Sequence, residues 1–473
     1  MIEGSNKFSI PVFAVVGHPN EGKSSVVSTL TEDDSIKISP IPGETTSSGN
    51  YTVEIDGKQI IRFVDTPGFQ APRQTLEWFK GYQGDPARLL FTFLTRFKSD
   101  PFFADECELL APLAWGAGII YVVDGSRPIR ENDLAEMEVL RLTGRPRMAV
   151  INSKSPGKDY VEEWRREFNK HFNGIRVFNS NTADFGERIR MLESLKAMDQ
   201  TWELDLAWVI RAFRRDWERR NRLACVHITH AIKKSIGYHV SRPLSDGDTA
   251  NLDVINGELL KEYPKGVRKI EQDMFDQIRG LFHHNLYRVT LPVYSVLNHD
   301  LFSRKTWDLL GLTRKQLIAA GAFMGGSLGA VADVSVHGLS FGIFTALGGV
   351  IGAGSAMLGG RRLAQVPGLG KRLGGDSYQV GPHKDPQFLY ILLDRALIYY
   401  QLIIQHPHGR RDVQEERPPG KKAGKTTHLS GTQRRICAQF FNAVSKGKGA
   451  KGETKKFAAL IQGLLEEISG IDD

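Results

Sequence analysis

The chain has 473 residues, with 62 basic and 54 acidic side chains and a formal net charge of +8. A chain of this length can bury two or three domain cores, and its hydrophobic content of 41% excludes a disordered protein. Cys107, Cys225 and Cys437 form no CxxC pair, which excludes a disulfide framework and a cysteine zinc site. Residues 1–10 lack the basic and apolar regions of a secretory signal, so we expect a cytoplasmic protein.

The first predicted elements are a strand at Ser9–Val16 and a helix at Ser25–Leu30, joined by a glycine-rich loop. The loop has the pattern G-x-x-x-x-G-K-S and consists of Gly17, His18, Pro19, Asn20, Glu21, Gly22, Lys23 and Ser24. Its backbone N–H groups and the positive end of the helix would surround phosphates, so we expect the loop and Ser25 to bind a nucleotide. Lys23 would contact the β- and γ-phosphates as a catalytic group, and Ser24 would bind Mg²⁺. The alternative is a turn without a ligand.

Further strand-like runs alternate with helical ones. They are Asn50–Ile55, Gln59–Val64, Gly118–Val123, Met148–Ile151 and Ile175–Phe178. Asp56 and Gly57 form a hairpin signal between the first two runs. With the glycine-rich loop, this pattern predicts an α/β P-loop NTPase domain over residues 1–200. We expect a doubly wound, mostly parallel sheet with its ligand at the carboxyl ends of the strands.

Two shorter motifs extend the predicted site. Asp65-Thr66-Pro67-Gly68 follows a strand, so the Asp65 carboxylate would hold Mg²⁺ through water and the Gly68 N–H would meet the γ-phosphate during catalysis. Residues 42–46 read PGETT in a polar stretch. A threonine there can bind Mg²⁺ and the γ-phosphate, then release them on hydrolysis. We favour Thr46, with Thr45 as the alternative; a plain solvated loop is the other interpretation.

Residues 69–116 are longer than a switch region requires. Helical runs are predicted at Leu76–Tyr82, Ala87–Phe97 and Asp105–Ala114. This insertion is either a mobile segment that senses the nucleotide or a set of helices packed on the sheet.

The segments GHPNEGKSS, PGETTSS and DTPG together resemble the GTPases of the Era, TrmE and EngA kind, which belong to the translation-factor-related class. The resemblance covers about the first 200 residues and implies that the domain binds GTP and GDP and hydrolyses GTP. It also implies that Asn20 helps to bind K⁺ beside the phosphates. In such GTPases an apolar residue, here Phe69, stands where Ras-like proteins have a water-positioning glutamine.

The base-recognition motif departs from the family pattern. N-K-x-D is expected after the strand Met148–Ile151, but this chain has Asn152-Ser153-Lys154-Ser155. We expect Asn152 and Lys154 to contribute to nucleotide binding, whereas the carboxylate that would pair with guanine is replaced by Ser155. Asp159 lies too far along to align without a rearranged loop. Ser180 and Asn181, after Ile175–Phe178, are candidates for the final S-A-K motif.

Residues 201–310 are predicted to form a helical arm and a linker. The long helical pattern Trp202–Ile236 is amphipathic and basic. Packing on the GTPase domain is the favoured interpretation, ahead of binding to anionic lipid. The polar stretch Ser241–Asp253 is predicted as a linker and Glu258–Leu281 as a helix.

Residues 311–473 are predicted to be mostly helical. Helices are expected at Pro386–Gln405, Thr432–Val444 and Thr454–Ile468, with a surface loop at His406–His428 and a basic linker at Lys446–Lys456. The run TWDLLGLTRKQLIAAGAFMGG resembles the glycine-rich C-terminal domain of unknown function attached to a group of bacterial Era-like GTPases.

A glycine-rich stretch at residues 317–360 stands out because it contains no Lys, Arg or Glu. Gly321, Gly325 and Gly329 recur every fourth residue, a spacing that lets two membrane helices approach closely. Its halves, 317–332 and 339–358, are about 16 and 20 residues long, and basic residues flank the whole stretch. The pattern predicts a glycine-zipper hairpin. It is either peripheral to or anchored in the inner face of the membrane, or it packs as a soluble hairpin.

Three functions are therefore compared. We rank first a GTP-hydrolysing switch coupled to the helical C-terminal domain. The second is a membrane-associated glycine-zipper protein gated by nucleotide with little turnover. The third is an RNA- or ribosome-associated assembly GTPase, although the sequence shows no recognisable aromatic-basic RNA-binding module. The expected partners are GTP and GDP, membrane lipid or an integral membrane protein, and a second copy in a nucleotide-dependent dimer.

Because Ser155 replaces the guanine-binding carboxylate, we expect weaker discrimination of GTP over ATP than in relatives with N-K-x-D. Each charge-assisted hydrogen bond to guanine is worth about 1.5–3 kcal/mol, so Ser155→Asp should raise the preference by at least about 10-fold. Competition titrations against fluorescent GDP measure this preference, with Ser153→Asp as the control for an added charge. A wild-type preference of several thousandfold would show that another residue reads the base.

Overall fold

The computed structural model describes residues 10–33, 48–152, 160–180, 182–244, 252–284, 371–373, 377–406, 408, 424–447 and 450–470. It divides into two compact units. The first comprises Met1–Arg219 with the later segments Phe282–Tyr287 and Ile404–Asp412, and the second comprises Arg220–Leu281, Arg288–Ile403 and Val413–Asp473. The predictions for residues 45–46, 153–159, 181 and 317–360 lie outside the described residues.

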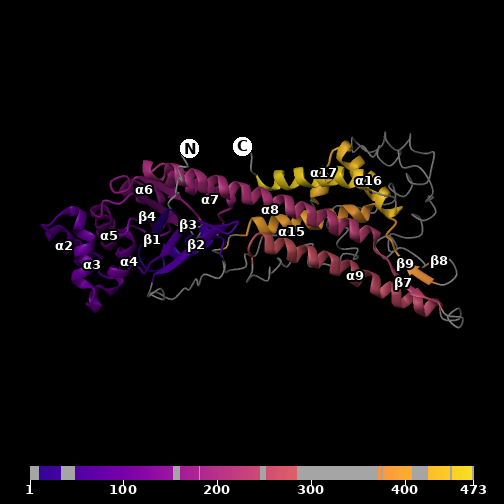
Figure 1. The fold of residues 1–473 in the computed structure, drawn as a ribbon, viewed down its shortest axis with the longest axis horizontal. Helices are drawn as coiled ribbons and strands as arrows, with labels where there is room; N and C mark the ends of the chain where they lie inside the picture. The colour runs from indigo at the N-terminus through magenta and orange to yellow at the C-terminus, as the bar shows by residue number, and fades with distance from the viewer. Residues whose placement is uncertain are drawn as a thin grey trace, which may run out of the picture. The chain divides into compact units, whose positions relative to one another are not determined.

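In the described part of the first unit, six strands form one sheet in the order β2-β3-β1-β4-β5-β6. Figure 1 labels the strands β2, β3, β1 and β4 of this sheet. The strands are β1 Val12–Val16, β2 Gly49–Ile55, β3 Lys58–Asp65, β4 Gly118–Asp124, β5 Arg147–Asn152 and β6 Gly174–Val177. β2 is antiparallel to β3, and the other neighbours are parallel. The predicted mostly parallel α/β sheet is thus confirmed. Since β1 pairs with both β3 and β4, the strand order reverses there, and the carboxyl end of β1 is the position where sheets of this kind bind ligands.

The central strands form because their sequences are apolar on both faces. Residues 13–16 of β1 and 118–123 of β4 are buried along their whole length, as expected of parallel strands covered by helices. At the edge, Asp56 and Gly57 have φ values of 52° and 73°, which is the backbone that a tight hairpin between β2 and β3 needs. The predicted hairpin is therefore present.

Helices cover this sheet, and three of them, α2 to α4, lie in the predicted insertion at residues 69–116. They are α1 Lys23–Thr31, α2 Pro72–Gly81, α3 Leu89–Phe97, α4 Ala104–Ala114, α5 Glu131–Leu142, α6 Val161–Phe168 and α7 Phe185–Lys196. Short 3₁₀ turns at Pro86–Arg88 and Pro101–Phe103 start after the aspartates Asp85 and Asp100, which cap them. Phe79, Phe93 and Leu110 belong to the same buried cluster as the strand residues. The insertion helices therefore pack on the sheet, as in the second of the two interpretations above.

The second unit is largely helical. Its elements are the later part of α8 Glu203–Gly237, β7 Val240–Pro243, α9 Leu252–Leu281, β8 Lys371–Leu373, β9 Ser377–Val380, α15 Gln387–Ile404, a 3₁₀ turn Lys425–His428, α16 Gly431–Ser445 and α17 Lys451–Ser469. Inside it, Arg395 forms a two-pronged ion pair with Glu271, at 2.6 and 2.8 Å, and both side chains are buried. Phe275 stacks on Tyr399 at 3.9 Å between ring centroids. These contacts join α9 to α15.

Three predictions for this region need correction. The predicted linker Ser241–Asp253 begins inside β7, which pairs with β9, and α9 already starts at Leu252. The predicted linker Lys446–Lys456 ends early, because α17 begins at Lys451. His408, placed in a surface loop by the sequence, has a relative exposure of only 7%. Strand pairing and helix formation extend into polar residues that stay exposed, such as Ser241 and Lys451, whereas His408 is polar and yet buried.

The described helices include one that meets the length and hydropathy of a membrane span, α15. Its mean hydropathy is 1.3 over 18 residues, but 72% of that stretch is buried inside the structure. Such burial makes it weak evidence for a span, since the core helix of a folded domain has the same composition.

Candidate nucleotide-binding site

The glycine-rich loop turns at the carboxyl end of β1 through residues with positive φ. Gly17, Asn20 and Gly22 have φ values of 143°, 67° and 94°. A Cβ on Gly17 would lie 2.4 Å from the Val122 carbonyl oxygen, so only glycine fits there. α1 then starts at Lys23 without a side-chain cap, which leaves its first N–H groups for an anion.

Lys23 points back along the loop rather than out to solvent. Its Nζ donates to the carbonyl oxygens of Gly17 at 3.1 Å and His18 at 3.0 Å, and the side chain is buried. The ammonium group thus lies inside the turn that the phosphates would occupy. Ser25 is also predicted to contact the nucleotide. It is buried in α1, and its carbonyl oxygen accepts from Thr29 Oγ1 at 2.9 Å.

The two predicted Mg²⁺ ligands meet. Ser24 Oγ donates to Asp65 Oδ2 at 2.6 Å, and Asp65 is only 3% exposed. Burial raises the pKa of Asp65, while the Ser24 hydroxyl and the Lys23 charge lower it. Within the described residues, Asp65 Oδ1 is buried without a hydrogen-bond partner. A hydroxyl and a carboxylate with a spare oxygen are hard ligands that suit Mg²⁺, so these residues fit the ion. Thr46, the third predicted ligand, lies outside the described residues.

The DTPG segment lies directly on the phosphate loop. A Cβ on Gly68 would lie 2.4 Å from Pro19 Cδ, so glycine is required for this approach. Thr66 Oγ1 donates to the Val15 carbonyl at 2.9 Å and fixes the start of the segment. Phe69 follows with its side chain fully buried. The Gly68 backbone therefore lies against the phosphate loop, and the role of its N–H in phosphate binding stays a prediction.

Glu106 of α4 holds the backbone just after DTPG, and sequence reasoning missed this contact. Its Oε1 accepts from the N–H groups of Gln70 at 2.8 Å and Ala71 at 2.6 Å. Glu106 is fully buried, which raises the pKa of its carboxyl, although the two N–H donors oppose this shift. Glu106 is one of three acidic residues in the run 104–114, so the sequence did not single it out.

On the base side, two predicted motifs come together. Asn152 Nδ2 donates to the Glu21 carbonyl at 3.2 Å, and Asn152 Oδ1 accepts from both the N–H and the hydroxyl of Ser180 at 3.2 Å. Asn152 and Ser180 are fully buried. Asn152 thus links the phosphate loop to the last motif. Lys154 and Asn181 lie outside the described residues.

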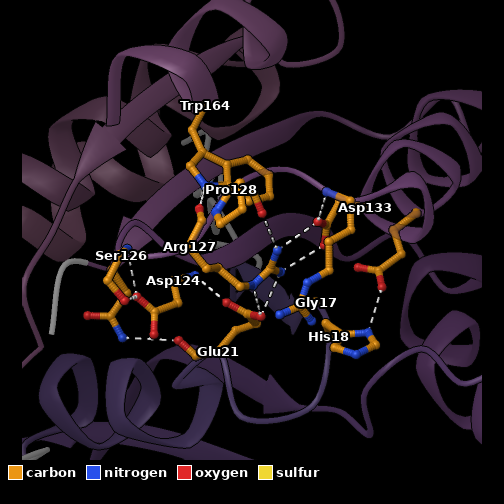
Figure 2. Close-up of polar contacts among 12 residues, drawn as sticks. Gly17, His18, Glu21, Asp124, Ser126, Arg127, Pro128, Asp133 and Trp164 are labelled. Carbon is orange, nitrogen blue, oxygen red and sulfur yellow. Dashed lines mark hydrogen bonds and ion pairs between the residues drawn. The ribbon is translucent and has the colours of Figure 1, made fainter. Parts of the chain in front are cut away.

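Two polar networks around the loop were not predicted (Figure 2). In one, His18 Nδ1 lies 3.1 Å from Glu136 Oε1, and Tyr121 OH donates to Glu136 Oε2 at 2.9 Å. Burial raises the pKa of Glu136, and the His18 contact lowers it. In the other, Glu21 pairs with Arg127 beyond β4. His18 and Glu136, like Glu21 and Arg127, are more than 100 residues apart in the sequence, so spacing gave no sign of these two contacts.

Comparison with characterised proteins places the N-terminal part among GTPases. Over 77 residues the chain is 40% identical to GTPase Der of Pseudothermotoga lettingae, a match covering 15% of this chain and 18% of that protein. It is 26% identical over 196 residues to the probable GTP-binding protein EngB of Xylella fastidiosa, covering 40% of this chain and 83% of that protein. A solved structure of Era in complex with MgGDPNP and 16S ribosomal RNA aligns with 56% of this chain and 90% of Era. The TM-score is 0.28 and the identity 16%.

Models of protein families divide the chain in two. Residues 12–153 match the 50S ribosome-binding GTPase family, which covers β1 to β5 and the phosphate loop. Residues 165–466 match the family described as a domain of unknown function, DUF3482. The second match starts within α6, in the first compact unit, and ends within α17. Because it spans more than half of the chain, this protein belongs to the DUF3482 family, and its residues 12–153 form a GTPase domain similar to Der and EngB.

Proposed function

We propose that this protein hydrolyses GTP and acts as a switch whose nucleotide state reaches its helical C-terminal region through α1. The phosphate loop, Lys23, Asp65 and Gly68 converge at the carboxyl end of β1 and support nucleotide binding there. Ser24 and Asp65 would hold Mg²⁺, which neutralises charge on the β- and γ-phosphates when bound. We also propose that Asn20 holds K⁺, on the strength of the loop's resemblance alone.

Hydrolysis at this site would depend on positioning and charge rather than on a general base at position 69. Phe69 is fully buried, and an apolar ring can neither accept a proton from water nor orient it. Lys23 and the loop N–H groups would instead fix the phosphates and stabilise the charge that develops on them. We therefore expect slow intrinsic turnover that a partner or K⁺ accelerates.

The observation that carries the switch proposal is a contact at the far end of α1. Lys23 and Ser24 form its first turn, and Ser28 lies near its last. Ser28 Oγ donates to the carbonyl oxygen of His408 at 3.0 Å, although the two residues are 380 positions apart. The segment Ile404–Asp412 belongs to the same compact unit as the phosphate loop and directly follows α15 in the sequence.

A buried ion pair strengthens this end of α1. Glu32, the C-cap residue, pairs with Arg188 of α7, and both side chains are at most 6% exposed. His283 Nδ1 lies 3.8 Å from Glu32 Oε2. His283 belongs to the segment Phe282–Tyr287, which directly follows α9. Ser28 thus contacts the segment Ile404–Asp412, and Glu32 lies near the other later segment of this unit, Phe282–Tyr287.

Aromatic packing holds these two later segments together. His408 Nε2 donates to the Phe282 carbonyl at 3.0 Å, and the His284 and His408 rings stack at 4.2 Å. Burial holds the pKa of His408 well below its usual value, so this ring is neutral. Trp217 of α8 packs against Phe282 at 5.2 Å. A shift of α1 on nucleotide exchange would therefore move the points at which α9 and α15 join this unit.

Lys23→Ala should abolish nucleotide binding and hydrolysis, because Lys23 supplies the positive charge inside the phosphate loop. Loss of a charge-assisted contact to each phosphate should weaken GDP binding by at least about 100-fold. Fluorescent-GDP titration and phosphate release measure the two properties, with the exposed Lys58→Ala as the control. Equal affinities of wild type and Lys23→Ala would contradict binding at this loop. A wild type that binds nucleotide but releases no phosphate would contradict the proposed hydrolysis and leave only nucleotide binding.

Arg188→Met should uncouple the switch, because it leaves Glu32 buried without its cation. Amide hydrogen exchange of Phe282–Tyr287 and Ile404–Asp412 should differ between GDP and a non-hydrolysable GTP analogue in wild type. In Arg188→Met that difference should disappear while hydrolysis persists. The matched control is Arg190→Met, which removes an exposed ion pair with Glu187 on the same helix. Equal exchange in both nucleotide states of the wild type would refute the coupling.

A second candidate, membrane association, is favoured by the composition of residues 317–360, which contain no Lys, Arg or Glu and repeat glycine every fourth residue at Gly321, Gly325 and Gly329. Carbonate extraction of cells should leave the wild type in the membrane fraction. Gly325→Leu should keep this partitioning in a membrane hairpin, whereas a soluble packed hairpin should aggregate because its core has no room for the side chain. Release of the wild type into the soluble fraction would exclude a membrane hairpin.

A further inference from the structure

The geometry points to Arg127 as a positioning residue for nucleotide binding: it neutralises Glu21, a carboxylate built into the phosphate loop, and thereby lets the loop accept an anion. This inference rests on the proposed nucleotide-binding function and deepens it. Figure 2 shows Glu21, Arg127 and Asp133 pointing toward one another.

Glu21 occupies an unfavourable place for an acid. It lies between Asn20 and Gly22, both with positive φ, in a loop whose N–H groups are shaped to surround phosphate. Its side chain is about 5% exposed, so water screens its charge little. A buried carboxylate beside a phosphate site would repel the nucleotide unless a cation compensates it.

Arg127 supplies that cation with a geometry matched to the carboxylate. Its Nε donates to Glu21 Oε1 at 2.7 Å, and a second guanidinium nitrogen lies 2.6 Å from the same oxygen. The other Glu21 oxygen accepts from the backbone N–H of Asp124 at the end of β4. The Glu21 carboxylate therefore has partners on both oxygens, and they tie the loop to the segment that follows β4.

The guanidinium is itself held on its remaining sides. It donates to Asp133 Oδ1 at 2.8 Å and Oδ2 at 2.7 Å, and it lies 5.2 Å from the centre of the Trp164 ring. Trp164 Nε1 donates to the Arg127 carbonyl at 2.9 Å. Burial lowers the pKa of Arg127, but the bonds with Asp133 and Glu21 outweigh this and raise it. Arg127 is therefore a fixed, permanent charge. It compensates two acids, so its loss would leave both uncompensated.

The Glu21 backbone is fixed as well. Its carbonyl oxygen accepts from Asn152 Nδ2 at 3.2 Å, on the base side of the site. The Glu21 side chain is thus held on Arg127 and its carbonyl on Asn152, so the carboxylate stays beside the loop. Arg127 is the cation that compensates this charge and makes the loop receptive to an anion.

If Arg127 only held β4 and α5 together, Glu21→Gln would not restore the GDP binding that Arg127→Met loses. A double-mutant cycle distinguishes this structural role from charge compensation. The affinity for GDP is measured by fluorescent-GDP titration for wild type, Arg127→Met, Glu21→Gln and the double variant. Arg127→Met should weaken GDP binding by at least about 10-fold, because an acid is left uncompensated at the phosphate site. Adding Glu21→Gln should restore most of that loss, since an amide carries no charge to repel the phosphates.

The control is Arg141→Met on α5, which breaks an exposed ion pair with Glu138 and should leave GDP affinity unchanged. Arg127→Lys keeps the charge and should bind GDP more tightly than Arg127→Met. If Arg127→Met fails to fold, Arg127→Gln takes its place in the cycle. A double variant that binds as weakly as Arg127→Met would overturn the inference, and so would unchanged affinity in Arg127→Met. A wild type that binds no GDP would instead refute the proposed function itself.

Discussion

The backbone of the phosphate loop is the constraint on which the rest of the N-terminal unit depends. Positive φ at Gly17, Asn20 and Gly22 turns the chain around the space for an anion, and a short peptide would not keep such a shape unaided. Distant elements hold it instead. Asn152 binds the Glu21 carbonyl, and the DTPG segment packs on Pro19 through Gly68. Much of the sheet's carboxyl edge thus serves one turn of about eight residues.

The two ends of α1 differ: the first turn continues the phosphate loop, and the last turn contacts segments far away in the sequence. Its first turn has no side-chain cap, so its N–H groups are left for an anion. Its last turn is held by several contacts, through Ser28 to His408 and through Glu32 to Arg188 and His283. In the proposed switch, α1 would pass a shift at its first turn to the contacts that fix its last turn, because the helix itself is stiff.

Sequence reasoning predicted the features whose signals lie in consecutive residues. A few consecutive residues are enough to recognise the phosphate loop, Asp65 after its strand, and the apolar runs of β1 and β4. Arg127 and Glu106 escaped prediction because a charged side chain reads the same in sequence whether it is solvated or buried against a distant partner. The strand β7 was missed for a related reason: it has four residues, and its partner β9 follows more than 130 positions later.

Glu106 couples the helical insertion to the segment that follows DTPG. One of its oxygens accepts from the N–H groups of both Gln70 and Ala71, and its side chain is fully shielded from water. If the segment after DTPG moved alone, this acceptor would lose both donors without gaining water, at a cost of about 1–3 kcal/mol or more. The segment and α4 must therefore move together or admit water between them. If the protein switches as proposed, each change of state would displace a packed helix as well as a loop.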